Sequence, residues 1–291
     1  LAESRIEPAT AHAEPPARAA VVVEAQVAAP PAQALDIAIL GEGYTAAELD
    51  AFRGDLRRAA DALLGFEPFA ARRGRINVRG VLLPSAEGGC DEPSRGIFRD
   101  TALGLAFDSL GSERYLLTED NRRLRDVAAN VPYDALVIMV NHERYGGGGI
   151  YGLYCSFTAR SPWADYLLPH EFGHSFAGLA DEYYSSEVAY NEFYPRGREP
   201  EEPNITALLD PEGLKWRDLV SAETALPTPW EKEAYDVRDG AYQAERRRLT
   251  QEIAEATRSG APPERLRALA GEEEALAAAH SRWTAGFLGA G

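Results

Sequence analysis

The chain has 291 residues, 45% hydrophobic and 26% charged, a profile typical of a soluble globular protein with one sizeable domain and an appendage. Its formal net charge of -16 argues against binding to nucleic acid, which normally requires a basic surface. The longest apolar runs fall well short of the roughly 20 residues that span a bilayer, so no membrane-spanning segment is predicted.

The first segment, residues 1–33, is rich in Pro and Ala, which indicates a linker or N-terminal extension with at most one strand. The chain begins at Leu1 without an initiating Met or an apolar leader. This start is typical of a fragment or of a mature form from which a signal peptide has been removed.

Strands and helices alternate after residue 33. Apolar runs predict strands at 35–40, 76–83 and 135–140. Helical patterns occur at 45–64, 103–110 and 119–129, and Thr45 with Glu48 forms a capping-box pattern at the start of the first. This alternation predicts an α/β fold, with a mixed sheet flanked by helices.

The Gly- and Tyr-rich stretch 145–155 predicts a flexible loop that leads into an edge strand over 149–155. An extended peptide can add to such an open strand, so this segment is the candidate substrate-binding edge. Residues 185–230 are loop-rich and contain many prolines. Apolar residues at 3-4 spacing within 239–284, broken at 259–263, then predict an inserted helical hairpin.

Only two cysteines occur, Cys90 and Cys155, and neither belongs to a C-x-x-C pair. Two cysteines are too few for a thiolate zinc site or an iron-sulfur cluster. A single disulfide between them is favoured over two buried thiols if the protein is secreted.

The segment His170-Glu171-Phe172-Gly173-His174 fits the pattern H-E-x-x-H. Histidines four residues apart project from one face of a helix, about 6 Å apart along its axis, so both can reach one metal ion. Apolar residues at helical spacing support a helix here, and Pro169 fits its first turn. The pattern predicts a zinc site in which His170 and His174 are ligands and Glu171 is the catalytic base that deprotonates a metal-activated water.

A third protein ligand must come from outside this motif. On an unbroken helix Asp181 would lie roughly 10 Å beyond His174, too far for a bond to the same metal. Gly178 can end the helix in the left-handed conformation, so that the chain turns back toward the metal. Asp181 is therefore favoured as the third ligand, with Glu182 as the alternative.

The longer segment that runs from His170 to Tyr183 resembles the zinc motif of the IgA-peptidase family of metallopeptidases. Other segments resemble this family too: Leu40-Gly41-Glu42-Gly43-Tyr44-Thr45, Glu67-Pro68-Phe69, Lys215-Trp216 and Pro227-Thr228-Pro229. The resemblance covers roughly residues 34–230. It implies a zincin-like catalytic domain over 34–230, in which the zinc helix lies under an edge strand, followed by the helical hairpin and a C-terminal segment over 231–291.

The resemblance also implies a bacterial zinc endopeptidase that is secreted or periplasmic. We expect it to act as a monomer on a protein or peptide substrate. The family usually continues past a Gly-rich segment like 287–291, which suggests a truncated C-terminus. The sequence departs from the wider metzincin pattern H-E-x-x-H-x-x-G-x-x-H, because Gly178 is one position late and Ala180 replaces the third His.

Tyr183 and Tyr184 are candidate donors to the oxyanion, although packing against the helix end is the favoured interpretation. Two other functions remain open. One is a catalytically inactive zinc-binding recognition module, which would have no need of Glu171. The other is a nucleotide-binding protein, because the turn over 41–46 fits G-x-G-x-x-A between a strand and a helix. The second strand lacks the acidic residue that would bind a ribose, so this alternative is the weaker one.

Overall fold

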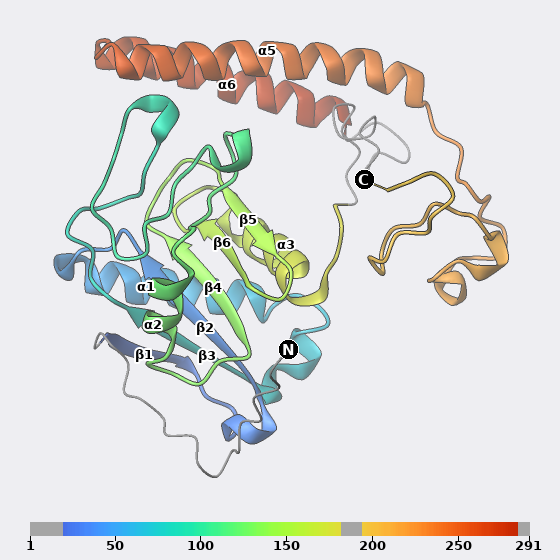
Figure 1. Cartoon of the computed structure of the whole chain (residues 1–291). Coiled ribbons are helices and arrows are strands. Elements are labelled where there is room, and N and C mark those ends of the chain that lie inside the picture. The colour runs from blue at the N-terminus through green and yellow to red at the C-terminus, as the bar shows by residue number, and fades with distance from the viewer. Residues whose placement is uncertain (1–19, 182–193, 285–291) are drawn as a thin grey trace, which may run out of the picture. The chain divides into compact units, whose positions relative to one another are not determined.

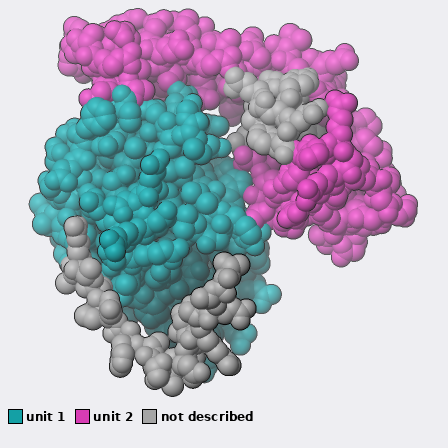
Figure 2. Space-filling model, viewed as in Figure 1, with its two compact units in different colours: residues 1–93, 98–177 teal, residues 94–97, 178–291 magenta. Residues whose placement is uncertain are grey.

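The structure is a computed structural model that describes residues 20–181 and 194–284 (Figure 1). The chain folds into two compact units, one formed by residues 1–93 and 98–177 and the other by residues 94–97 and 178–291 (Figure 2). Within the described residues, no helix combines the length and the apolarity needed to cross a bilayer.

A six-stranded mixed sheet forms the centre of the first unit. Its strands are β1 (Val21–Gln26), β2 (Leu35–Glu42), β3 (Ile76–Leu82), β4 (Ala135–Val140), β5 (Gly147–Ile150) and β6 (Tyr154–Thr158). The strand order is β1-β3-β2-β4-β6-β5. The four inner strands are parallel, whereas β1 and β5 run antiparallel at the two edges. The predicted mixed sheet flanked by helices is confirmed.

The inner strands are buried on both faces, since each face is covered by helices or loops. On one face, Ile37 and Ile39 of β2 belong to a core that includes residues of α1 (Leu49–Leu63) and α3 (Ala164–Ala177). On the other face, Ala38 and Leu40 pack in a core with α2 (Asn121–Ala128) and the segment 102–107.

The first predicted helix is confirmed, with a different beginning. The capping box at Thr45 is present, because the Glu48 carboxylate accepts from Thr45 N–H at 3.0 Å. It opens a short 3-10 turn, Ala46–Glu48, and the α-helix proper follows as α1.

The prediction of a helix over 103–110 is wrong. The chain there is irregular, with an isolated β-bridge at Ala106 and a 3-10 turn at Ser109–Gly111. Gly104 and Asp108 have positive φ, 64° and 61°, which a right-handed α-helix does not allow. The buried Glu42 carboxylate holds this conformation, because it accepts from Leu103 N–H at 2.8 Å and from Leu105 N–H at 3.0 Å.

The strand predicted over 149–155 is corrected to a hairpin. β5 ends at Ile150, residues 151–153 turn, and β6 begins at Tyr154. Gly152 has φ +69°, which is the conformation that lets the chain reverse so tightly.

The two cysteines are free and buried, so the favoured disulfide is wrong. Cys90 packs in the core on the α2 face of the sheet, whereas Cys155 packs in the core on the face covered by α1 and α3. The sheet therefore separates the two thiols. Burial raises both thiol pKa values well above their ordinary value, and both thiols stay protonated.

The predicted helical hairpin is present in the second unit as α5 (Lys232–Arg258) and α6 (Pro263–Thr284). Its buried centre consists of Leu249, Ile253 and Leu269. The domain boundaries at 33 and 230 stay predictions, since the division of the chain into two units falls elsewhere, after Ala177.

Candidate active site

The motif helix α3 is longer at its start than the sequence suggests. It begins at Ala164, whose N–H donates to Ser161 C=O at 3.0 Å, and Pro169 lies inside it rather than in the first turn. The predicted place of Pro169 in the first turn is therefore wrong, because a Pro can also lie inside a helix at the cost of a helical hydrogen bond. Leu167, Leu168 and Phe172 are fully buried against the sheet and fix the helix in place.

The helix ends as predicted. Ala177 is its last residue, and Gly178 follows with φ +65°, in the left-handed region that terminates helices.

The two histidines of the motif face each other. Their Nε2 atoms are 3.2 Å apart, and their rings are nearly perpendicular, at 84°. Two ligands of one tetrahedral zinc, each at about 2.05 Å, lie about 3.3 Å apart, so the observed separation suits a shared ion. The ring of Tyr166 stacks on that of His170 with centroids 5.8 Å apart, which restricts the His170 ring.

Asp181 lies with the two histidines. One ligand atom from each of His170, His174 and Asp181 falls within 4.8 Å of the others. The histidines are partly buried and Asp181 is exposed. Two imidazoles and a carboxylate are the donor set of one class of catalytic zinc sites, so the residues fit the predicted metal. Glu182, the alternative ligand, and Tyr183 and Tyr184 lie outside the described residues.

Glu171 is buried beside the edge strand β5. A side chain at Gly147 would come within 3.0 Å of its carboxylate oxygen Oε1, and one at Gly149 would come within 2.6 Å of both Glu171 O and His174 Cβ. Glycines at these two alternate positions therefore let β5 lie directly against the motif helix. The sequence carries this signal in the glycine run 146–149, but without the pairing partner it does not show what the glycines approach.

The turn over 41–46 and the histidine that follows β4 have structural explanations. In the turn proposed for a nucleotide, Gly43 has φ +68°, and a Cβ there would lie 1.9 Å from Gly89 O, so the glycine allows close contact with the chain itself. His142, which follows β4, faces Glu92 with Nε2 and Oε1 3.3 Å apart. Arg144 donates to the same carboxylate at 2.9 Å, which makes the group an internal ion-pair cluster.

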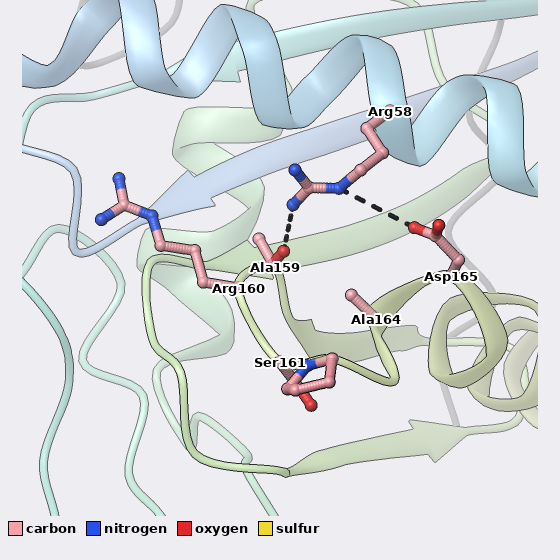
Figure 3. Close-up of a pocket in the computed structure, with 7 residues that line it drawn as sticks. Arg58, Ala159, Arg160, Ser161, Ala164 and Asp165 are labelled. Carbon is pink, nitrogen blue, oxygen red and sulfur yellow. Dashed lines mark hydrogen bonds and ion pairs between the residues drawn. The ribbon is translucent and has the colours of Figure 1, made fainter.

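A pocket of about 350 Å³ lies at the other end of the motif helix (Figure 3). Arg58, one of the two arginines that line it, donates a hydrogen bond to Ala159 C=O. It also forms ion pairs with Asp55 at 3.2 Å and Asp165 at 3.8 Å. Arg160 also pairs with Asp55, at 3.7 Å. Neither the motif histidines nor Glu171 line this pocket, and its charges are compensated internally. We therefore do not assign the chemistry to it.

Two histidines four residues apart on one helix face, with a glutamate beside them, are the arrangement of an H-E-x-x-H motif. A family model described as IgA Peptidase M64 matches residues 23–290. The chain belongs to this family and is a peptidase. No curated protein matches the sequence.

Proposed function

We propose that the protein is a secreted zinc-dependent endopeptidase in which His170, His174 and Asp181 hold the metal and Glu171 is the general base. The observation that carries the proposal is the grouping of two imidazoles and one carboxylate within 4.8 Å of one another, next to a buried glutamate. Membership of the IgA peptidase M64 family supports peptide-bond hydrolysis as the reaction.

When bound, zinc would supply a Lewis acid that polarises the peptide carbonyl and lowers the pKa of a coordinated water to about 7. Glu171 accepts a proton from the attacking water and delivers it to the leaving amine. Its carboxylate lies close to Gly147 of β5, where an added Cβ would be 3.0 Å from Oε1. The Glu171 side chain is buried, which limits the access of bulk water to it.

The substrate is proposed to lie extended along β5. Successive residues of a strand direct their backbone polar groups to opposite sides, so Gly149 presents its N–H and C=O on the same side as Gly147. The groups of Gly147 on that side are already bonded: its N–H donates to Arg114 C=O, and its C=O accepts from Leu116 N–H, both at 3.1 Å. Peptide addition is therefore expected at the Gly149 end of the strand.

The first test is elemental analysis of the purified chain and of His174→Ala after incubation with zinc. We expect about one zinc per chain in the wild type and loss of zinc in the variant. A folded, zinc-supplemented wild type that binds no metal would overturn the proposal.

The base is tested by Glu171→Gln with a peptide library as substrate. Hydrolysis should fall on the order of 10³-fold while zinc content is unchanged, because the amide cannot accept the proton. Unchanged hydrolysis would remove Glu171 from the mechanism. A wild type that binds zinc but cleaves no peptide would instead favour the inactive recognition module.

Secretion is supported only by the family's general character and is tested separately, by fractionating cells that express the full-length gene. Recovery of the protein in the cytoplasm alone would contradict it. The monomeric state likewise stays a prediction, which size-exclusion chromatography with light scattering checks.

A further inference from the structure

One side chain from a distant part of the sequence holds the residue that precedes Asp181. Asn204 accepts at Oδ1 from Ala180 N–H at 2.8 Å, and its Nδ2 donates to Ala180 C=O at 2.8 Å. These two groups belong to the successive peptide planes on either side of the Ala180 α-carbon, so both planes are fixed. The backbone nitrogen of Asp181 lies in the second plane. The Asp181 carboxylate can then move only by rotation about the φ angle and the side-chain torsion angles of Asp181.

Asn204 itself lies in a loop that Lys215 organises. The Lys215 ammonium donates to Pro200 C=O and Glu202 C=O at 2.6 Å each, and to Ile205 C=O at 2.9 Å. An ammonium has three N–H donors, so these three carbonyls use all of them. Two of the carbonyls flank Asn204 in sequence, and the loop position of Asn204 therefore depends on Lys215.

Apolar packing contributes little to this loop. Among residues 194–230, all of which the structure describes, Pro200 and Leu214 are the two apolar residues that are buried. Among the described residues, the Asn204 amide links the loop to the segment carrying Asp181, and Lys215 holds the loop in position around Asn204.

We propose that Asn204 is a positioning residue for the third metal ligand, Asp181, an inference that rests on the zinc site proposed above. Asn204 acts by ordering the ligand's backbone before the metal arrives, which lowers the entropy lost on binding. Residues that orient metal ligands in this way typically contribute about 10- to 100-fold to metal affinity.

The test is the zinc dissociation constant, measured by competition with a chromogenic chelator, for the wild type, Asn204→Ala, Asp181→Ala and the double variant. We expect Asn204→Ala to weaken zinc binding about 10-fold. In the Asp181→Ala background the same substitution should have no further effect, because Asn204 acts only through Asp181. A general loss of structure would not produce this dependence.

Two further variants control for packing and folding. Asn204→Asp preserves the side-chain volume and the acceptor for Ala180 N–H, but it turns a second oxygen toward Ala180 C=O, so zinc binding should again weaken. Asn130→Ala is the matched control: its Oδ1 also accepts a backbone N–H, at 3.3 Å, and its Nδ2 donates to Val127 C=O at 2.9 Å. It lies at the end of α2, and its loss should leave zinc affinity unchanged.

The positioning role would be overturned if both Asn204 variants bound zinc as tightly as the wild type. It would also be overturned if Asn204→Ala weakened zinc binding by the same factor in the Asp181→Ala background as in the wild type. Both results leave the proposed zinc site intact if Asp181→Ala itself weakens binding. If Asp181→Ala binds zinc as tightly as the wild type, the ligand assignment fails and the role of Asn204 fails with it.

Discussion

The two parts of the proposed zinc site are held in place by different forces. The helix that carries His170 and His174 buries Leu167, Leu168 and Phe172 in the core that it shares with the sheet. The segment that carries Asp181 is held by the paired hydrogen bonds of one amide side chain. Apolar packing tolerates little change in volume, whereas a few polar bonds near the surface can open locally. The two parts should therefore respond differently to substitution.

The largest effect is expected where the edge strand meets the motif helix. Gly149→Ala would place a Cβ 2.6 Å from both Glu171 O and His174 Cβ, so β5 and α3 must move apart. Overpacking of this kind costs typically 1–3 kcal/mol, and we expect a loss of about 2 kcal/mol in the free energy of unfolding. Urea denaturation measures it, and zinc binding should weaken as well because His174 is displaced.

The matched control is Gly54→Ala in α1, where an added Cβ meets no atom within 4 Å. Alanine in an exposed helix interior is better than glycine by about 0.5–1 kcal/mol, so this variant should be more stable than the wild type. If Gly149→Ala unfolds at the same urea concentration as the wild type, the contact between β5 and the motif helix is looser than the structure indicates.

The packed part of the site could be predicted from the sequence because its signals are periodic and local. Apolar runs predicted β2, β3 and β4, and the histidine spacing with its apolar neighbours predicted the motif helix. Gly178 predicted the end of the motif helix, because glycine readily adopts the left-handed backbone conformation in which helices commonly end.

What could not be predicted depends on contacts between distant residues. The Glu42 carboxylate accepts hydrogen bonds from Leu103 N–H and Leu105 N–H across about sixty residues of sequence, and no local pattern predicts this contact. Asn204 has no periodic context either, and in the sequence it stands out only as part of an Asn-Ile-Thr triplet. Its role depends on which backbone its amide meets in the folded chain.

A smaller effect is expected from Lys215→Met, which keeps most of the apolar stem and removes the three donors. The loop over 199–208 should then open more often, with a local cost of about 1–2 kcal/mol. That cost corresponds to roughly 5- to 30-fold faster amide exchange in the loop, measured by mass spectrometry. Exchange in β4 should not change, because the sheet is held by its own core. Equal acceleration in β4 and the loop would mean that the two regions open together.

The smallest effect concerns His280, which lies in α6 of the helical hairpin. The His280 ring stacks on Tyr242 with centroids 3.7 Å apart, and its Nε2 lies 3.6 Å from Asp239. Burial lowers the pKa of His280 below its ordinary value of 6.5 and outweighs the opposing effect of Asp239. The neutral ring is thus favoured in the folded state.

A histidine whose folded pKa is depressed contributes stability above its unfolded pKa, and this contribution is lost as the pH falls from 6.5 through the folded value. We therefore expect the urea midpoint of the wild type to decrease between about pH 7.5 and pH 5.5, and this decrease to be smaller in His280→Gln. An NMR titration of the imidazole protons gives the pKa directly, with the variant identifying the signal. A pKa at or above 6.5 would show instead that Asp239 dominates, and the hairpin would then be stabilised by acid.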